Sequence, residues 1–242
     1  MNAAADEVTR DSLLRGRVKL LQPARGFRSS LDPVLLAGFV GVPCGHFLDI
    51  GCGTGAVAFL LLTRDPQATG LGVEIQPRLA GLAARAVEEN GFGARFVLQN
   101  ADVREPGRVA AASFDLVATN PPFRPVGKGV LPPHHERSLA HHEVTLSLAE
   151  WLDVARLALK STGRLCVVYP AERLAELQAG LAARGLHASR VRLVEPHAGQ
   201  TPNRVLLEAR LGSGPTLREP PLVLHEGGTY SPEVRSMLGE ET

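Results

Sequence analysis

The sequence lacks several features that would assign it to a membrane, secreted or metal-binding class. No apolar run approaches the ~18 residues that a membrane-spanning helix needs. The first residues, MNAAADEVTRD, are too polar for a signal peptide, so we expect a cytoplasmic protein. The three cysteines show no CxxC spacing, which predicts buried thiols without a disulfide or a metal. A net charge of only +1 argues against a generic polyanion binder.

What the sequence does contain is a regular alternation of apolar strands and amphipathic helices. Strands are predicted near 46–50, 69–74, 94–99, 114–119, 164–169, 188–194 and 204–211. Helices are predicted from near Ala56, around the apolar stripe Leu79, Leu82, Ala83, Ala86 and Val87, over 146–160 with Gly163 as a stop, and over 172–184. This order predicts an α/β protein with one doubly wound, seven-stranded, mostly parallel sheet.

The chain can bury one substantial core, and nothing in it indicates a second independent domain. We divide it into a basic N-terminal segment with a helix at 1–45, the α/β domain at 46–211, and a C-terminal appendage at 212–242 that packs on the same domain. The stretch GSGPTLREPP at the start of the appendage has the composition of a short linker.

A glycine-rich turn follows the first predicted strand of the α/β domain. Gly51, Gly53 and Gly55 would let the backbone approach a ligand at the N-terminus of the next helix. The turn satisfies both G-x-G-x-G and the dinucleotide pattern G-x-G-x-x-A. Asp49, at the end of the strand, would repel a pyrophosphate but attract a methionine ammonium. The turn therefore favours S-adenosylmethionine over NAD.

Acidic residues also follow the next two predicted strands. Glu74 ends the strand LGVE, where a carboxylate can bind a ribose diol. Asp102 follows the strand RFVLQ, where it can accept a hydrogen bond from the amino group of the cofactor adenine. Each acid alone could be a solvated loop residue. Ligands bind beyond the carboxyl ends of parallel strands, so acids at three successive strand ends favour a cofactor site.

The fourth strand ends in Asn120, Pro121, Pro122 and Phe123. Consecutive prolines fix the backbone and present the Asn120 amide rigidly, and Phe123 adds a flat apolar face. This pair suits a planar, conjugated NH2 group that is gripped while its nitrogen reacts. The alternative is that Asn-Pro-Pro is only a strand-ending turn. The preceding acids at the same predicted edge favour the catalytic interpretation.

Two segments carry a local excess of positive charge. Residues 1–28 contain six Arg or Lys against three acids, and the stretch after Phe123 adds Arg124, Lys128 and Arg137. We expect both segments to flank the cleft and contact phosphate, although an ordinary solvated surface would have the same composition. Paired histidines at 134–135 and 141–142 lack the spacing of a metal site, and we expect no metal.

Together DIGCGTG, VEI, NAD and NPPF resemble the class I S-adenosylmethionine-dependent methyltransferases that act on exocyclic or amide nitrogen. More narrowly, the chain resembles the bacterial tRNA(Val) adenine N6-methyltransferases over roughly residues 15–240. SSLDPVLLAGF, AHHE, HAGQTPNRVLLEARLGSG and PPLVLHEGGTYSPEVRSMLG carry the resemblance outside the glycine turn and NPPF. His141 replaces the usual arginine of that family, and Phe123 stands where tyrosine is common.

The resemblance implies a Rossmann-like fold, S-adenosylmethionine as cofactor and tRNA as substrate. It adds Asp32, Ile75 and Val103 to the cofactor residues. It also adds His142 to the expected RNA contacts, which are otherwise Arg28 of the basic N-terminal segment and Arg124, Lys128 and Arg137. The implied reaction is methylation of the exocyclic N6 of an adenine next to the anticodon.

An aromatic NH2 is a poor nucleophile because its lone pair is delocalised into the ring. Hydrogen bonds to the Asn120 side-chain oxygen and the Pro121 carbonyl would direct that lone pair toward the methyl group. Positioning of this kind can contribute roughly 7–11 kcal/mol. A guanine N2 of ribosomal RNA and a protein glutamine N5 also present planar NH2 groups, and a binding protein without transfer activity is the alternative from another class.

Overall fold

A computed structural model describes residues 7–25, 29–121 and 146–240. Its strands are β1 (Val8–Leu13), β2 (Val18–Pro23), β3 (His46–Ile50), β4 (Thr69–Glu74), β5 (Phe96–Asn100), β6 (Phe114–Thr119), β7 (Leu159–Pro170), β8 (Leu186–Glu195), β9 (Arg204–Leu211), β10 (Leu217–Arg218), β11 (Leu222–Val223), β12 (His225–Glu226) and β13 (Thr229–Tyr230). Its helices are α1 (Asp32–Val40), α2 (Ala56–Arg64), α3 (Pro77–Glu89), α5 (Leu148–Ala158), α6 (Leu174–Ala182), α7 (Pro232–Met237) and a 3-10 turn, η2 (Ala171–Arg173).

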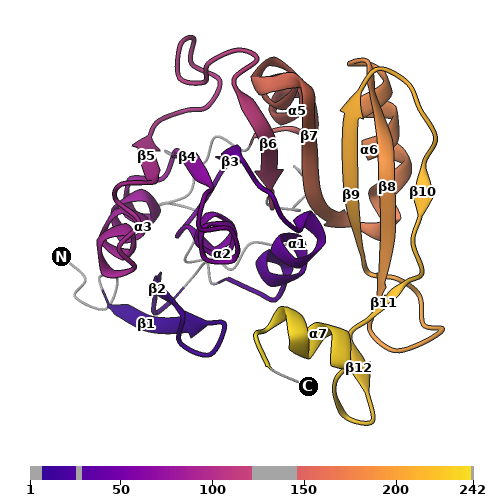
Figure 1. Cartoon of the computed structure of the whole chain (residues 1–242), viewed down its shortest axis with the longest axis horizontal. Coiled ribbons are helices and arrows are strands. Elements are labelled where there is room, and N and C mark those ends of the chain that lie inside the picture. Colours follow the sequence, from indigo (N-terminus) through magenta and orange to yellow (C-terminus); the bar gives the residue numbers. More distant parts are fainter. Residues whose placement is uncertain (1–6, 26–28, 122–145, 241–242) are drawn as a thin grey trace, which may run out of the picture.

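The predicted doubly wound sheet is confirmed. The strand order is β10-β8-β9-β7-β6-β3-β4-β5, and β11 also pairs with β8 (Figure 1). Strands β7, β6, β3, β4 and β5 are mutually parallel, whereas β9 runs antiparallel to both β7 and β8. The sheet therefore has a parallel half and an antiparallel half. The two short strands β10 and β11 extend the antiparallel half beyond the seven predicted strands.

Alternate side chains of each central strand enter two different cores. Phe47, Leu116 and Leu206 belong to the core that α1, α2 and α3 cover. Leu48 and Val117, one residue further along β3 and β6, belong to the core that α5 and α6 cover. Strands buried on both faces read as continuous apolar runs, which is why these strands show no polar alternation in the sequence.

The chain termini add elements that the strand prediction did not include. Strands β1 and β2 form an antiparallel hairpin beside α3 (Figure 1). Asn90, which caps α3, accepts from the Lys19 backbone N–H at 2.8 Å and donates to the Lys19 carbonyl at 2.8 Å. Near the other terminus, the Arg64 guanidinium donates to the Met237 carbonyl at 2.6 Å and thereby fixes α7 on α2.

Gly163 does not stop a helix, contrary to the sequence prediction. Helix α5 ends at Ala158, and β7 begins at the next residue and continues through Gly163. The pairing of β6 with β7 shifts register between Phe114 and Leu116. A Cβ at Gly163 would lie 2.9 Å from the Phe114 carbonyl oxygen. This glycine therefore permits close approach of two strands at an irregular pairing.

None of the helices in the described ranges has both the length and the apolar character that crossing a lipid bilayer requires.

Candidate active site

The parallel half of the sheet brings the predicted cofactor and catalytic residues to one edge. Asp49 in β3 lies beside Gly72 of β4 and Ala118 of β6. Glu74 ends β4, and Asn120 directly follows β6. Because these strands are adjacent and parallel, their carboxyl ends form a continuous edge, where open α/β sheets bind ligands. Asp102, two residues after β5, continues that edge.

The glycine turn connects β3 to α2. The backbone N–H groups of Gly51 and Cys52 donate to the Val73 carbonyl at 2.9 and 3.2 Å. Gly51 has φ +65°, and a Cβ there would meet nothing within 4 Å, so space lies open above the turn. Gly55 has φ +89°, and a Cβ there would lie 2.5 Å from the Phe59 ring. The turn therefore needs glycine both for its backbone conformation and for its packing on α2.

Asp49 is buried beneath this turn with 1% of its surface exposed. Its carboxylate accepts from the Ala58 backbone N–H at 3.2 Å, in the first turn of α2. Burial raises the pKa of Asp49 to about 8, although the Ala58 hydrogen bond lowers it and the nearby Glu74 raises it further. Asp49 thus has a hydrogen-bond partner in α2 that the sequence did not predict. Its role toward the methionine ammonium stays a prediction.

Glu74 also contacts the glycine turn. Its carboxylate accepts from the Gly53 N–H at 2.9 Å and from the Gln76 N–H at 2.8 Å. Burial raises the pKa of Glu74, while these backbone hydrogen bonds lower it in part. The Asn100 amide donates to the carbonyls of Glu74 and Ile75 at 2.8 and 3.1 Å, which fixes the end of β4. Glu74 and Ile75 therefore occupy a rigid position at the edge.

Asp102 is held by an arginine that the sequence analysis did not single out. Arg104 donates to both carboxylate oxygens of Asp102, with the closest contact at 2.6 Å, and to Glu150 at 2.8 Å. The Arg104 hydrogen bonds lower the pKa of Asp102. Glu150 also forms a capping box with Ser147 at the start of α5. Asp102 is therefore a fixed, ionised acceptor, whereas Val103 beside it is buried in the core.

Asn120 and Pro121 complete the edge. The Thr119 hydroxyl donates to the Ile50 carbonyl at 2.9 Å, which joins the ends of β6 and β3 just before the two functional segments begin. Asn120 is partly exposed and Pro121 is buried. The other predicted catalytic and RNA-contacting residues lie outside the described ranges: Pro122, Phe123, Arg124, Lys128, Arg137, His142 and Arg28.

Asp32 lies at the start of α1, where it pairs with the antiparallel half of the sheet. Its carboxylate accepts from Arg204 Nε at 3.3 Å, and its backbone N–H donates to the Ser30 hydroxyl at 3.2 Å. This pair joins α1 to the first residue of β9. The structure therefore gives Asp32 a tertiary contact, and its role toward the cofactor stays a prediction.

The N-terminal basic residues do not form one surface. Arg10 pairs with Glu89 at 3.3 Å, and the Lys19 ammonium donates to the Glu89 carbonyl at 3.1 Å, both at the last turn of α3. Arg17 lines a pocket beside the last turn of α2. Helices α2 and α3 end near the amino ends of the following strands, so these three residues lie away from the carboxyl edge.

The residues at the carboxyl edge fit S-adenosylmethionine. The carboxylates of Asp49 and Glu74 lie next to the turn, and residues 51–56 carry no Lys or Arg that could neutralise a pyrophosphate. The Thr54 hydroxyl is buried without a hydrogen-bond partner in the described ranges, so the turn carries a polar group that can bond to a ligand. Carboxylate acceptors without neighbouring cations suit a cofactor that has hydroxyl groups and a positive charge. No group of three or more potential metal ligands occurs in the same ranges.

Comparison with known proteins identifies the family. The Methyltransferase small domain model matches residues 33–179, more than half of the chain. The tRNA1(Val) (adenine(37)-N6)-methyltransferase of Porphyromonas gingivalis is 34% identical, with 90% of this chain and 89% of that protein covered. The protein of the same name from Trichodesmium erythraeum is 29% identical, with 86% and 87% covered.

A solved structure supports the same assignment at the level of the fold. A predicted O-methyltransferase from Agrobacterium tumefaciens superposes with a TM-score of 0.69 at 25% identity, and the match covers 86% of this chain and 96% of that one. The relatives at 29–34% identity carry the finer assignment, since they match along nearly their whole length. The resemblance inferred from the motifs is confirmed, and the chain belongs to the tRNA1(Val) (adenine(37)-N6)-methyltransferase family.

Proposed function

We propose that this protein transfers the methyl group of S-adenosylmethionine to the exocyclic N6 of the adenine just 3′ of the anticodon of a tRNA. The observation that carries the proposal is the convergence of the glycine turn, Glu74, Asp102 and Asn120 on one edge of four adjacent parallel strands. The relatives named for adenine 37 supply the base and its position. A tRNA substrate supports a cytoplasmic location, which is part of the proposal.

Each of the cofactor residues would bind a different part of S-adenosylmethionine. The turn leaves open space above Gly51 for the methionine carboxylate, next to the N-terminus of α2. Asp49 lies buried beneath the turn, where a positively charged ligand would favour its ionised form. Glu74 accepts from the ribose hydroxyls. Asp102 would accept from the adenine amino group, and Ile75 and Val103 would supply apolar contacts. Because Glu74 and Asp102 already have fixed partners, their oxygens are positioned before the cofactor arrives.

When bound, the cofactor supplies an electrophilic methyl group on a positively charged sulfur. Asn120 and Pro121 act on the other reactant: the side-chain oxygen of Asn120 and the carbonyl of Pro121 accept hydrogen bonds from the target NH2. Both acceptors follow a strand whose end is tied to β3 by Thr119, so they hold the nitrogen at a fixed place. Orientation of this kind can supply roughly 7–11 kcal/mol of the barrier reduction.

The target base has to leave its stack to reach this edge. An anticodon loop is single-stranded, so its bases unstack at lower cost than those of a duplex. Phe123, which lies outside the described ranges, is proposed to stack on the extruded base. Base–aromatic stacking of this kind is worth about 1–3 kcal/mol.

The proposal is tested with labelled S-adenosylmethionine and transcribed tRNAs. We expect label in a valine tRNA that carries adenine 3′ of the anticodon and none in the same transcript with guanine there. Nucleosides from a deletion strain should lack the corresponding N6-methyladenosine by mass spectrometry. Label in ribosomal RNA as N2-methylguanine, or in a protein glutamine, would replace the proposed substrate. Cofactor binding without any transfer would overturn the enzyme assignment.

A further inference from the structure

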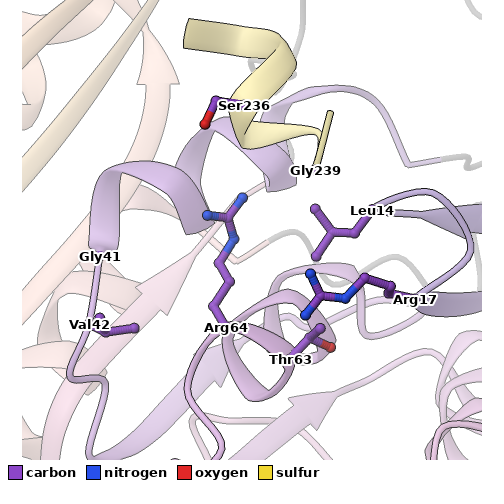
Figure 2. Close-up of a pocket in the computed structure, with 8 residues that line it drawn as sticks. All are labelled: Leu14, Arg17, Gly41, Val42, Thr63, Arg64, Ser236 and Gly239. Carbon is purple, nitrogen blue, oxygen red and sulfur yellow. The ribbon is translucent and has the colours of Figure 1, made fainter. Parts of the chain in front are cut away.

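A pocket of about 350 Å³ lies at the opposite end of the sheet from the candidate active site. Arg17 from the turn of the β1–β2 hairpin, Val42 from the loop between α1 and β3, Arg64 from the last turn of α2, and Ser236 from α7 line it (Figure 2). Elements from both chain termini and from the α/β domain therefore meet around one hollow. None of the described residues of the proposed methyl-transfer site lines it.

Two guanidinium groups enter this pocket. Figure 2 shows the side chains of Arg17 and Arg64 extending toward its centre from different elements. Burial lowers the pKa of Arg64, and the positive charge of Arg17 lowers it further. In the ranges that the structure describes, neither residue forms an ion pair with Asp or Glu. Like charges that face each other without a counter-charge are destabilising and favour binding of an anion.

The hydrogen bonds of the pocket leave donors available. One terminal nitrogen of Arg64 donates to the Met237 carbonyl at 2.6 Å, whereas its Nε is buried without an acceptor in the described part of the chain. The neighbouring acid, Asp65, does not compensate these charges, because its carboxylate accepts from the backbone N–H groups of Cys44 at 2.8 Å and Gln67 at 3.0 Å. Arg64 Nε is thus a buried donor without an acceptor in the described ranges, whereas the Thr63 hydroxyl in the same pocket donates to the Phe59 carbonyl at 2.7 Å.

We propose that this pocket binds an oxyanion, a phosphate or a phosphodiester, between the guanidinium groups of Arg17 and Arg64. Guanidinium groups match the tetrahedral oxyanion geometry through paired N–H donors. An anion bound there would connect the N-terminal hairpin to the last turn of α2, which already holds α7 through the Met237 carbonyl. Because only the folded chain assembles this site, binding would raise the stability of the protein by mass action.

The test measures thermal unfolding and calorimetric binding with inorganic phosphate, against chloride at equal ionic strength. We expect a saturable rise in Tm for the wild type. Arg17→Gln should weaken phosphate binding about tenfold or more, because it removes a charged donor. Arg15→Gln is the matched control, since Arg15 lies on the same turn but does not line the pocket. Arg64→Gln is a second variant, but it also loses the bond to α7.

A second measurement distinguishes free phosphate from an RNA backbone. The affinity for a single-stranded RNA oligonucleotide is compared in the wild type, Arg17→Gln and Arg15→Gln. Weaker phosphate binding with unchanged RNA affinity in Arg17→Gln identifies a free oxyanion as the ligand. A loss of RNA affinity confined to Arg17→Gln identifies a phosphodiester. No saturable response to phosphate or RNA in the wild type, or equal responses in the wild type and both variants, would overturn the proposal.

Discussion

Buried carboxylates occur in both halves of the sheet, but their surroundings differ. Asp49 and Glu74 in the parallel half and Glu208 in the antiparallel half are all at most 4% exposed. Glu208 accepts from the Ser189 hydroxyl and Arg210 at 2.9 Å and lies 3.4 Å from Arg164 and Arg190. No Lys or Arg of the described ranges pairs with Asp49 or Glu74.

The pKa shifts follow this difference. Burial alone would raise the pKa of Glu208, but the Ser189 hydrogen bond and the charges of Arg210 and Arg164 bring it below its ordinary value. Burial raises the pKa values of Asp49 and Glu74 with no cation to offset it. Equal burial therefore serves two purposes. The antiparallel half supplies cations to its acid within the fold, whereas the acids of the parallel half have no Lys or Arg partner in the described ranges. A positively charged ligand would therefore favour the ionised form of Asp49 and Glu74.

The largest expected effect is a loss of turnover when a residue at the carboxyl edge of the parallel half is changed. Asn120→Ala should abolish turnover, at least about 10³-fold or ~4 kcal/mol, because it removes the acceptor assigned to the target nitrogen. Cofactor affinity should stay within about tenfold, or ~1.4 kcal/mol. Single-turnover methylation and calorimetry measure the two quantities. Near-normal turnover would remove Asn120 from the mechanism and leave the carboxyl edge as a binding site only.

The second prediction concerns the antiparallel half. Glu208→Gln should destabilise the fold by about 3 kcal/mol, because it removes a buried charge shared by Arg164, Arg190 and Arg210. Arg190 keeps its ion pair with Glu219 at 2.8 Å. The affinity of the folded protein for S-adenosylmethionine should not change, since Glu208 lies outside the parallel half. Urea unfolding and calorimetry provide these values. A large loss of cofactor affinity in a folded variant would show that the two halves are coupled and that Glu208 does not act in the antiparallel half alone.

The fold and much of the carboxyl edge could be predicted from the sequence, because the signals are local. Continuous apolar strands, a glycine turn and acids at strand ends each occupy a few neighbouring residues. Parallel pairing then brings Asp49, Glu74 and Asn120 together without further information. The bounds of β3, β4 and β6 agree with the predicted strands to the residue.

The remaining features depend on contacts between residues that are distant in the sequence. Arg104 pairs with Glu150, 46 positions further along the chain, and no local sequence pattern predicts that pair. Gly163 follows a helical pattern, but its place is decided by the approach of β6. The sequence shows Asp49 near the end of a strand and therefore predicts a ligand contact. Its hydrogen bond with the Ala58 N–H depends on how the turn packs on α2, which the sequence does not show. Local patterns therefore predict which residues share one edge of the sheet but not the contacts among them.

The third prediction concerns the pH dependence of the free energy of unfolding that the buried Asp49 causes. Because the Asp49 pKa of about 8 in the fold exceeds its ordinary value of 3.8, its proton stabilises the folded state at low pH, and this stability is lost as pH rises toward 8. Asp49→Asn should therefore be no less stable than the wild type at pH 8 and should lose this pH dependence. Urea unfolding at several pH values checks it. The same pH dependence of the unfolding free energy in both proteins would contradict a raised pKa of Asp49.

The same substitution should weaken cofactor binding. Ionised Asp49 attracts a cation, so wild-type affinity for S-adenosylmethionine should increase between pH 6 and 9 as the carboxyl group loses its proton. Asp49→Asn should reduce the affinity at pH 9 by about 10- to 100-fold, or ~1.4–2.8 kcal/mol, and should remove the increase. Calorimetry across this range measures both. A variant with wild-type affinity at every pH would assign Asp49 to the packing of the turn alone.

The smallest expected effect tests the one acid of the edge that does have a cation. Arg104 holds Asp102 in a fixed, ionised state, so Arg104→Gln should raise the KM for S-adenosylmethionine about three- to tenfold with little change in kcat. The matched control is Arg108→Gln, because Arg108 forms a comparable pair with Glu105 at 2.7 Å, with both side chains about half exposed. A purely structural role would lower the Tm of Arg104→Gln and leave its KM unchanged at 25 °C. Equal KM values for the two variants would therefore show that Asp102 needs no partner to bind the cofactor, and the ion pair would then belong to the stabilising contacts of the fold, as the pairs of Glu208 do.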